Sequence, residues 1–152
     1  MLNKKKAKEH DLLVFQNKFG TVTASLQHKI YLPRGLIGMP ESKAFCLAPA
    51  PNDKFKSFKV LQSIQNGQLC FLTLPIGLNN NIIRAEDLQK VIDNLGLEIK
   101  NTAVILICST KKMSDKARIV TNARAPIFID IFNKIAYQYI LYNSDYSLTH
   151  IL

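Results

Sequence analysis

Hydrophobic and polar positions along most of the chain follow the pattern of short strands. Runs rich in Val, Ile, Leu and Phe alternate with segments that contain Gly, Pro, Asn or Asp, and such runs between turn residues are typical of β-structure. Strands are predicted on this basis at residues 12–16, 21–25, 29–32, 43–47, 58–64, 68–74 and 102–109. A loop is predicted at residues 33–40, where two Gly and two Pro lie close together, and a polar turn at residues 111–116.

Two turns predict hairpins. Asn66-Gly67 separates two β-type runs, and both residue types tolerate the positive φ of a type I′ turn. Asn133-Lys134 separates the last two apolar runs and predicts a terminal hairpin. Pro126 has no backbone N–H, so it fits the start of the first strand of that hairpin. No nucleophile, base or metal ligand stands there at a usual spacing, which favours binding over catalysis.

One segment has the period of a helix. Leu88, Val91, Ile92 and Leu95 recur at i, i+3, i+4 and i+7, which places them on one face of an α-helix. Gly96 stands where a glycine commonly ends a helix in the left-handed conformation. Polar residues cover the other face, so we expect a helix that lies on the surface of a sheet.

Together these elements predict a mainly β fold. About nine or ten short strands and a single helix are typical of a barrel or sandwich with a helix packed alongside. We expect a small β-barrel-like domain of short antiparallel strands with one surface helix over residues 11–152. Residues 1–10 form a predicted flexible basic arm, because four Lys stand there without apolar periodicity.

Cysteine and histidine usage gives no support to a metal site or a cofactor. Cys46, Cys70 and Cys108 each lie within an apolar run, where a free thiol packs as a small hydrophobe. There is no Cys-x-x-Cys motif. We therefore predict three free core cysteines in a reducing compartment, no metal and no cofactor.

A catalytic triad is not indicated either. Asp145, Ser147 and His150 lie close together in sequence, but triads are defined in space and no Gly-x-Ser-x-Gly elbow is present. Cap or turn roles for Asp145 and Ser147 are the favoured interpretation. The chain is predicted not to be an enzyme. Its longest apolar run, 103–108, is too short to span a membrane, so we expect a soluble, cytoplasmic protein.

Positive charge is concentrated at the front of the chain. The formal net charge is +9, and the first sixty residues hold eleven Lys and Arg against four Asp and Glu. Residues 54–59 interleave cations with Phe55 and Phe58, a composition that suits stacking on single-stranded nucleic acid. The alternative interpretation is a solvated edge strand, in which Lys blocks aggregation.

Several short motifs stand in an order that resembles one protein family. Asn-x-x-Ala-Pro-Ile precedes a strand and a turn, a Gln follows in the next strand, and Tyr-x-x-x-His lies near the end. This arrangement resembles the C-terminal part of FliW, the bacterial flagellar assembly factor, and the upstream motifs extend the resemblance to residues 12–152. The residues that carry it are Phe19, Gly20, Pro33, Gly35, Gly38, Leu61, Gln62, Ser63, Asn122, Ala125, Pro126, Ile127, Gln138, Tyr146 and His150.

The resemblance implies a compact β-barrel-like domain and a function. FliW proteins bind newly made flagellin and also bind CsrA, a small dimeric RNA-binding repressor of translation, so that flagellin level is coupled to flagellin synthesis. Implied here are flagellin and CsrA as partners, a monomer, and no direct contact with membrane or nucleic acid. The alternative is a small basic β-barrel that binds single-stranded RNA. Partner-binding residues are expected on three segments: Leu61, Gln62 and Ser63; Asn122, Ala125, Pro126 and Ile127; and Gln138.

Overall fold

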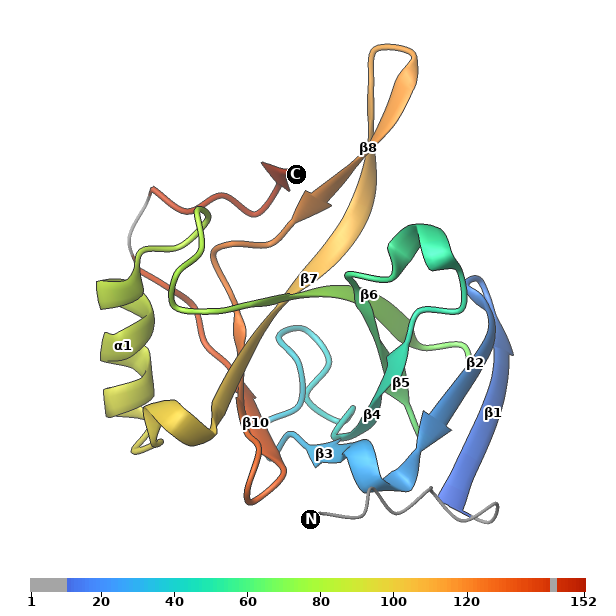
Figure 1. Ribbon diagram of the computed structural model, residues 1–152, viewed down its shortest axis with the longest axis horizontal. Coiled ribbons are helices and arrows are strands. Elements are labelled where there is room, and N and C mark those ends of the chain that lie inside the picture. The colour runs from blue at the N-terminus through green and yellow to red at the C-terminus, as the bar shows by residue number, and fades with distance from the viewer. Residues whose placement is uncertain (1–10, 143–144) are drawn as a thin grey trace, which may run out of the picture.

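The fold is mainly β, and the described part of the chain has one α-helix, as the sequence predicts (Figure 1). The computed structural model describes residues 11–142 and 145–152, so the predicted arm at residues 1–10 lies outside the described residues. The helix is α1 (Ala85–Asn94). The strands are β1 (Leu12–Asn17), β2 (Gly20–Ser25), β3 (Lys29–Tyr31), β4 (Ala44–Pro49), β5 (Lys59–Ser63), β6 (Cys70–Ile76), β7 (Thr102–Met113), β8 (Lys116–Thr121), β9 (Ile127–Asp130), β10 (Ile135–Gln138) and β11 (His150–Ile151).

The larger sheet closes on itself. Its strands pair in the order β7, β6, β5, β4, β3, β10 and β9, and β9 returns to pair with β7. All of these pairings are antiparallel except that of β10 with β3, which rests on the single pair Ile135 and Tyr31. Closure leaves no free edge within the ring of strands, which removes the usual site of edge-to-edge association.

The interior of the ring is a continuous apolar core. Side chains from every strand of the ring alternate inward, because successive residues of a strand face opposite sides of a sheet. The centre is closed by side chains such as Phe45, Leu61 and Ile127, which have no exposed surface. The domain is therefore filled at its middle and can be hollow only at its two ends.

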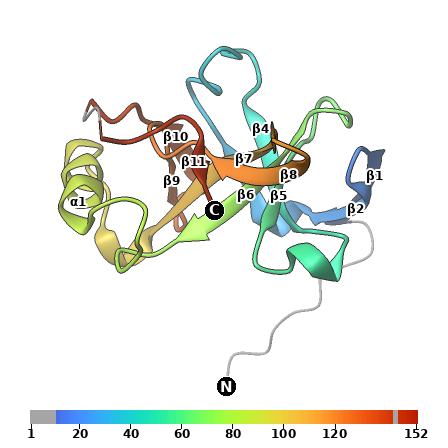
Figure 2. The same ribbon diagram turned by 90° about the horizontal axis from the view of Figure 1, so that it is seen from above.

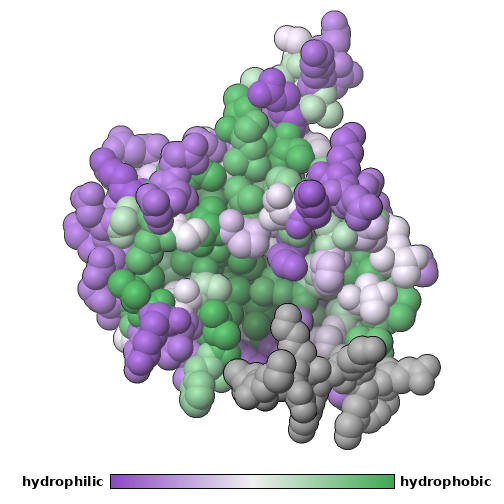
Figure 3. All heavy atoms as spheres, viewed as in Figure 1, coloured by the Kyte–Doolittle hydropathy of each residue, from purple (hydrophilic) through white to green (hydrophobic). Residues whose placement is uncertain are grey.

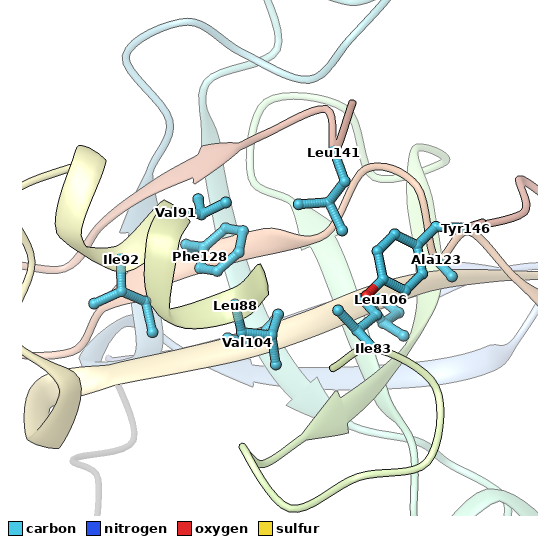
Figure 4. Close-up of a cluster of buried hydrophobic side chains, with 10 residues drawn as sticks. All are labelled: Ile83, Leu88, Val91, Ile92, Val104, Leu106, Ala123, Phe128, Leu141 and Tyr146. Carbon is cyan, nitrogen blue, oxygen red and sulfur yellow. The ribbon is translucent and has the colours of Figure 1, made fainter. Parts of the chain in front are cut away.

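Two outer layers cover opposite sides of the ring (Figures 1 and 2). The β1–β2 hairpin packs through Val22 and Ala24 against outward-facing residues of β4, β5 and β6. On the other side α1 places Leu88, Val91 and Ile92 on β7 and β9, in the cluster drawn in Figure 4. Each buried Leu, Val or Ile stabilises the fold by roughly 1.5 to 3 kcal/mol, so both layers are firmly held.

The helix and the terminal hairpin were predicted correctly. Leu95 is the C-cap of α1, and Gly96 follows with φ +70°. β9 and β10 flank the turn that contains Asn133 and Lys134, and Lys134 has φ +57°. Pro126 directly precedes β9, and the three cysteines are free and buried.

The predicted type I′ turn at Asn66-Gly67 is wrong. Gly67 is not among the glycines with positive φ, and residues 64–69 form a longer loop between β5 and β6. Side chains hold this loop: Ser63 Oγ accepts a hydrogen bond from Asn66 N at 3.1 Å, and Asn66 Oδ1 accepts one from Gln68 N at 3.1 Å. The Asn side chain therefore forms a local turn of its own, which the dipeptide signal could not distinguish from a tight hairpin.

The predicted turn at residues 111–116 is too long. β7 continues to Met113, and β8, which was not predicted, begins at Lys116. The two strands project from the ring as a ribbon (Figure 1). Both faces of this ribbon are exposed at its tip, so its residues lack the alternation of apolar and polar positions by which a strand is recognised.

Candidate functional site

A groove at one end of the ring brings several of the predicted site residues together. We call it the motif groove, and its volume is about 280 Å³. Figure 2 shows that the loop after β3 projects on this side of the ring, while the turn before β5 lies on the opposite side. Strand, loop and C-terminal residues form its walls: Leu36, Ile37, Met39, Phe71, Ile107, Asn122, Arg124, Ala125, Gln138, Ile140 and Leu148.

Gln138 fastens the loop at residues 33–40 to the rim of this groove. Its Oε1 accepts a hydrogen bond from Ile37 N at 2.8 Å, and its Nε2 donates to Ala125 O at 3.1 Å. The loop reaches this position because Gly35 and Gly38 adopt the positive φ values, +64° and +84°, that glycine tolerates. The loop predicted at residues 33–40 is thereby confirmed.

Asn122 shapes the segment that leads into β9. Its Oδ1 accepts hydrogen bonds from both Arg124 N and Ala125 N at 3.0 Å, a local turn that its residue type favours. Ala125, Pro126 and Ile127 are buried behind it. Of this predicted segment, Asn122 and Ala125 line the groove, and the other two residues support its wall.

The predicted segment Leu61, Gln62 and Ser63 lies away from the surface. All three side chains are buried. Gln62 Oε1 accepts from Asn17 Nδ2 at 2.8 Å, and Gln62 Nε2 donates to Gly67 O at 3.0 Å. The side chain thus ties the β1–β2 hairpin to the loop after β5, and any part of this segment in binding acts through the shape of the ring.

The most accessible apolar residues of the groove were not predicted. Ile37, Ile140 and Leu148 are 51%, 45% and 57% exposed, although each carries a large apolar side chain. They stand in loops or just after a strand, where no periodic pattern marks a residue as surface or core. Exposed apolar side chains that gather around a groove are typical of sites that bind other molecules.

Tyr146, which carries part of the family resemblance, anchors α1. Its hydroxyl donates to Asp87 Oδ2 and accepts from Arg84 N at 3.1 Å. The hydrogen bond from Tyr146 is the main cause that holds the pKa of Asp87 below its usual value, and Arg84 adds to it. Arg84 also pairs with Asp145 at 3.5 Å.

The predicted turn role of Ser147 is confirmed, since its Oγ accepts a hydrogen bond from Thr149 N at 3.0 Å.

The interpretation of residues 54–59 as a solvated edge strand is wrong. Asp53–Phe55 is a 3₁₀ turn, and β5 begins only at Lys59. Phe55 and Phe58 pack edge to face, with ring centroids 6.0 Å apart, and both are half-buried. Part of each ring's surface is therefore taken up by contact with the rest of the protein.

Within residues 11–142 and 145–152, no group of His, Cys, Asp and Glu is arranged to hold a metal ion. No helix in the same residues is long and apolar enough to cross a membrane.

Comparisons with known proteins agree with the fold and the motifs. The family described as FliW protein matches residues 14–152. The chain belongs to the FliW family. A flagellar assembly factor FliW from Clostridium botulinum strain Hall is 34% identical over 125 residues, covering 81% of this chain and 84% of the relative. One from Bacillus pumilus is 28% identical over 141 residues, covering 92% and 96%.

A solved FliW structure has the same fold. The crystal structure of a flagellar assembly factor FliW superposes with a TM-score of 0.66 at 20% identity, covering 92% of this chain and 95% of that one. The fold shows where the FliW motif residues of this chain lie. Gln138 and Asn122 frame the motif groove, Tyr146 fixes the helix, and Leu61, Gln62 and Ser63 belong to the interior.

Proposed function

We propose that this chain is a flagellar assembly factor that binds flagellin in the motif groove and antagonises CsrA, so that flagellin level controls flagellin translation. The observation that carries the proposal is the groove itself. Family-motif residues frame it, and its rim presents three exposed apolar side chains.

The shape of the ring favours one kind of partner. Proteins recognise peptides either by adding a strand to a free sheet edge or by holding an amphipathic helix in a groove. Because the strands of the ring are all paired on both sides, strand addition has no site there. An apolar groove beside Arg124 suits the apolar face of a helix, with a polar residue of the helix at the rim.

Partner exchange then needs no chemical step. If flagellin and CsrA compete for overlapping surfaces, export of flagellin frees the assembly factor to bind CsrA. Mass action alone sets the outcome, because each partner lowers the fraction of free protein available to the other.

The test is a titration of three ligands at low and high salt: a flagellin terminal-helix peptide, CsrA and a single-stranded RNA. Apolar contact is screened weakly, so binding of the two protein ligands should survive high salt. RNA binding falls steeply instead, with a slope of about −0.7 per phosphate contact for single strands. Tight RNA binding at physiological salt without affinity for either protein would favour the alternative of an RNA-binding barrel.

Variants locate the site. Leu148→Ser and Ile140→Ser remove exposed apolar side chains of the rim, and each should weaken flagellin binding by about 1 to 2 kcal/mol, roughly five- to thirtyfold. Leu78→Ser is the matched control, because Leu78 is also an exposed Leu, at 38%, but does not line the groove. Equal loss in all three variants would contradict the placement of the site.

A further inference from the structure

The opposite end of the ring carries a second hollow, with a different chemistry. We call it the lysine mouth, and its volume is about 370 Å³. Inward positions of the ring, among them Ile30, Leu47 and Ile129, form part of its wall, and cationic residues lie around it. The residues are Gln27, His28, Lys29, Ile30, Leu47, Ala48, Pro49, Lys59, Ala103, Ile129, Ile131 and Lys134.

The apolar wall is the open end of the core. Ala103 precedes the buried Ile105 by two positions on β7, and Ile131 follows Ile129 by two positions after β9. Residues two apart face the same side of a strand, so Ala103 and Ile131 continue the inward face to the rim. Ile131 is 56% exposed there.

The rim is positively charged. Lys59 precedes the buried Leu61 by two positions on β5, so it leaves the strand on the inward side, at the mouth. Lys29 and Lys134 lie around the same opening, and Lys134 Nζ donates to Gln27 O at 2.9 Å. Among the described residues that line the mouth, none is acidic. Coulomb attraction by these cations would favour an anion at the opening.

The depth of the hollow limits what can enter it. Phe45, Leu61 and Ile127 close the centre of the ring, so the hollow is a dish and does not continue as a channel. A long acyl chain needs a deep apolar tunnel, whereas a single Leu, Ile or Phe side chain fills a dish of this kind. Backbone on either side of such an anchor would pass directly over the lysines.

From the apolar dish and its cationic rim we infer that the lysine mouth binds an acidic peptide segment of a partner protein: one apolar anchor side chain flanked by Asp or Glu. Figure 3 shows hydrophobic residues over the middle of one face of the molecule, with hydrophilic residues around them. This site lies at the other end of the ring from the motif groove and does not depend on the proposed function.

The test uses the full chain and a set of fluorescent eight-residue peptides, each with one Leu, Ile or Phe between two pairs of Asp or Glu. Control peptides replace the acids with Lys or the anchor with Ser. Anisotropy should show binding of an acidic anchored peptide and at least tenfold weaker binding of both controls, because charge and apolar contact are both required.

Two variants and two matched controls locate the binding. Lys59→Glu and Ile131→Ser should each weaken peptide binding about tenfold or more, since each removes one part of the recognition. Lys112→Glu, which makes the same charge change on the β7–β8 ribbon, and Leu148→Ser, in the motif groove, should stay within about twofold. Both test positions are exposed, so folding is preserved, and far-UV circular dichroism checks it.

Three results would overturn the inference. One is equal weakening by Lys59→Glu and Lys112→Glu, which would mean attraction by net charge alone. Another is saturable binding of dodecanoate at the mouth with no binding of any peptide in the set. The third is binding of an acidic peptide that Leu148→Ser abolishes and Ile131→Ser does not, which would place it in the motif groove. Loss of flagellin binding in Leu148→Ser tests the proposed function separately.

Discussion

Replacing Gln62 by Met tests whether this residue is a structural clamp or a partner contact. The substitution keeps the length of the side chain and removes its amide. Gln62 has no exposed surface, and its amide makes three hydrogen bonds of 3.1 Å or less: from Asn17 Nδ2 at 2.8 Å, to Gly67 O at 3.0 Å and to Ser63 O at 3.1 Å.

The expected loss of stability follows from these bonds. A buried hydrogen bond contributes about 1 kcal/mol net, and a buried group left without a partner costs about 1 to 3 kcal/mol. Asn17 Nδ2 also donates to Gly67 O at 3.2 Å, so that oxygen keeps one donor in the variant. The apolar Met side chain offsets part of the remaining loss of stability. We expect Gln62→Met to lower the free energy of unfolding by about 2 to 3 kcal/mol, or Tm by roughly 5 to 10 °C.

Urea unfolding followed by far-UV circular dichroism measures this difference, because the chain has no Trp to report by fluorescence. Gln65→Met is the matched control, because Gln65 is exposed in the loop that follows β5. This substitution should lower the free energy of unfolding by less than about 0.5 kcal/mol. Equal stability of the two variants would refute the clamp, and a loss of flagellin binding by a fully stable Gln62→Met would make Gln62 a contact residue.

Tyr146→Phe should lower the free energy of unfolding by about 1 to 2 kcal/mol at neutral pH. Since Tyr146 holds the pKa of Asp87 low, this contribution is present above about pH 4 and is lost as pH falls through the folded pKa, so urea curves of the two proteins should converge in acid. Gly35→Ala should lower the free energy of unfolding by at least about 1 kcal/mol more than Gly38→Ala does. A Cβ at Gly35 would lie 2.5 Å from two backbone oxygens, whereas a Cβ at Gly38 meets open space. Equal stability of the two variants in calorimetry would contradict this. Burial raises the pKa of all three cysteine thiols. Ellman's reagent should therefore react slowly with the folded protein and rapidly in 6 M guanidinium, about the usual denaturing concentration. Fast reaction without denaturant would show that a thiol is accessible.

The features that the sequence determined by itself are local ones. The period of Leu88, Val91, Ile92 and Leu95, ended by Gly96, defined α1 because a helix is stabilised between residues three and four apart. Two further elements could be predicted from the sequence: the loop with Gly35 and Gly38, and the hairpin around Asn133-Lys134. Each depends on backbone conformations that a few neighbouring residues favour.

Tertiary structure decided everything that joins distant segments. Ile37 and Gln138, which share a hydrogen bond, are 101 positions apart, and no periodicity relates them. The closure of β9 on β7 fixes which end of the ring each strand residue reaches, and so divides the surface into the motif groove and the lysine mouth. The same packing enclosed Gln62 and left Leu148 exposed, the reverse of what polarity suggests, because burial depends on which neighbours the chain brings over a residue and not on the residue alone.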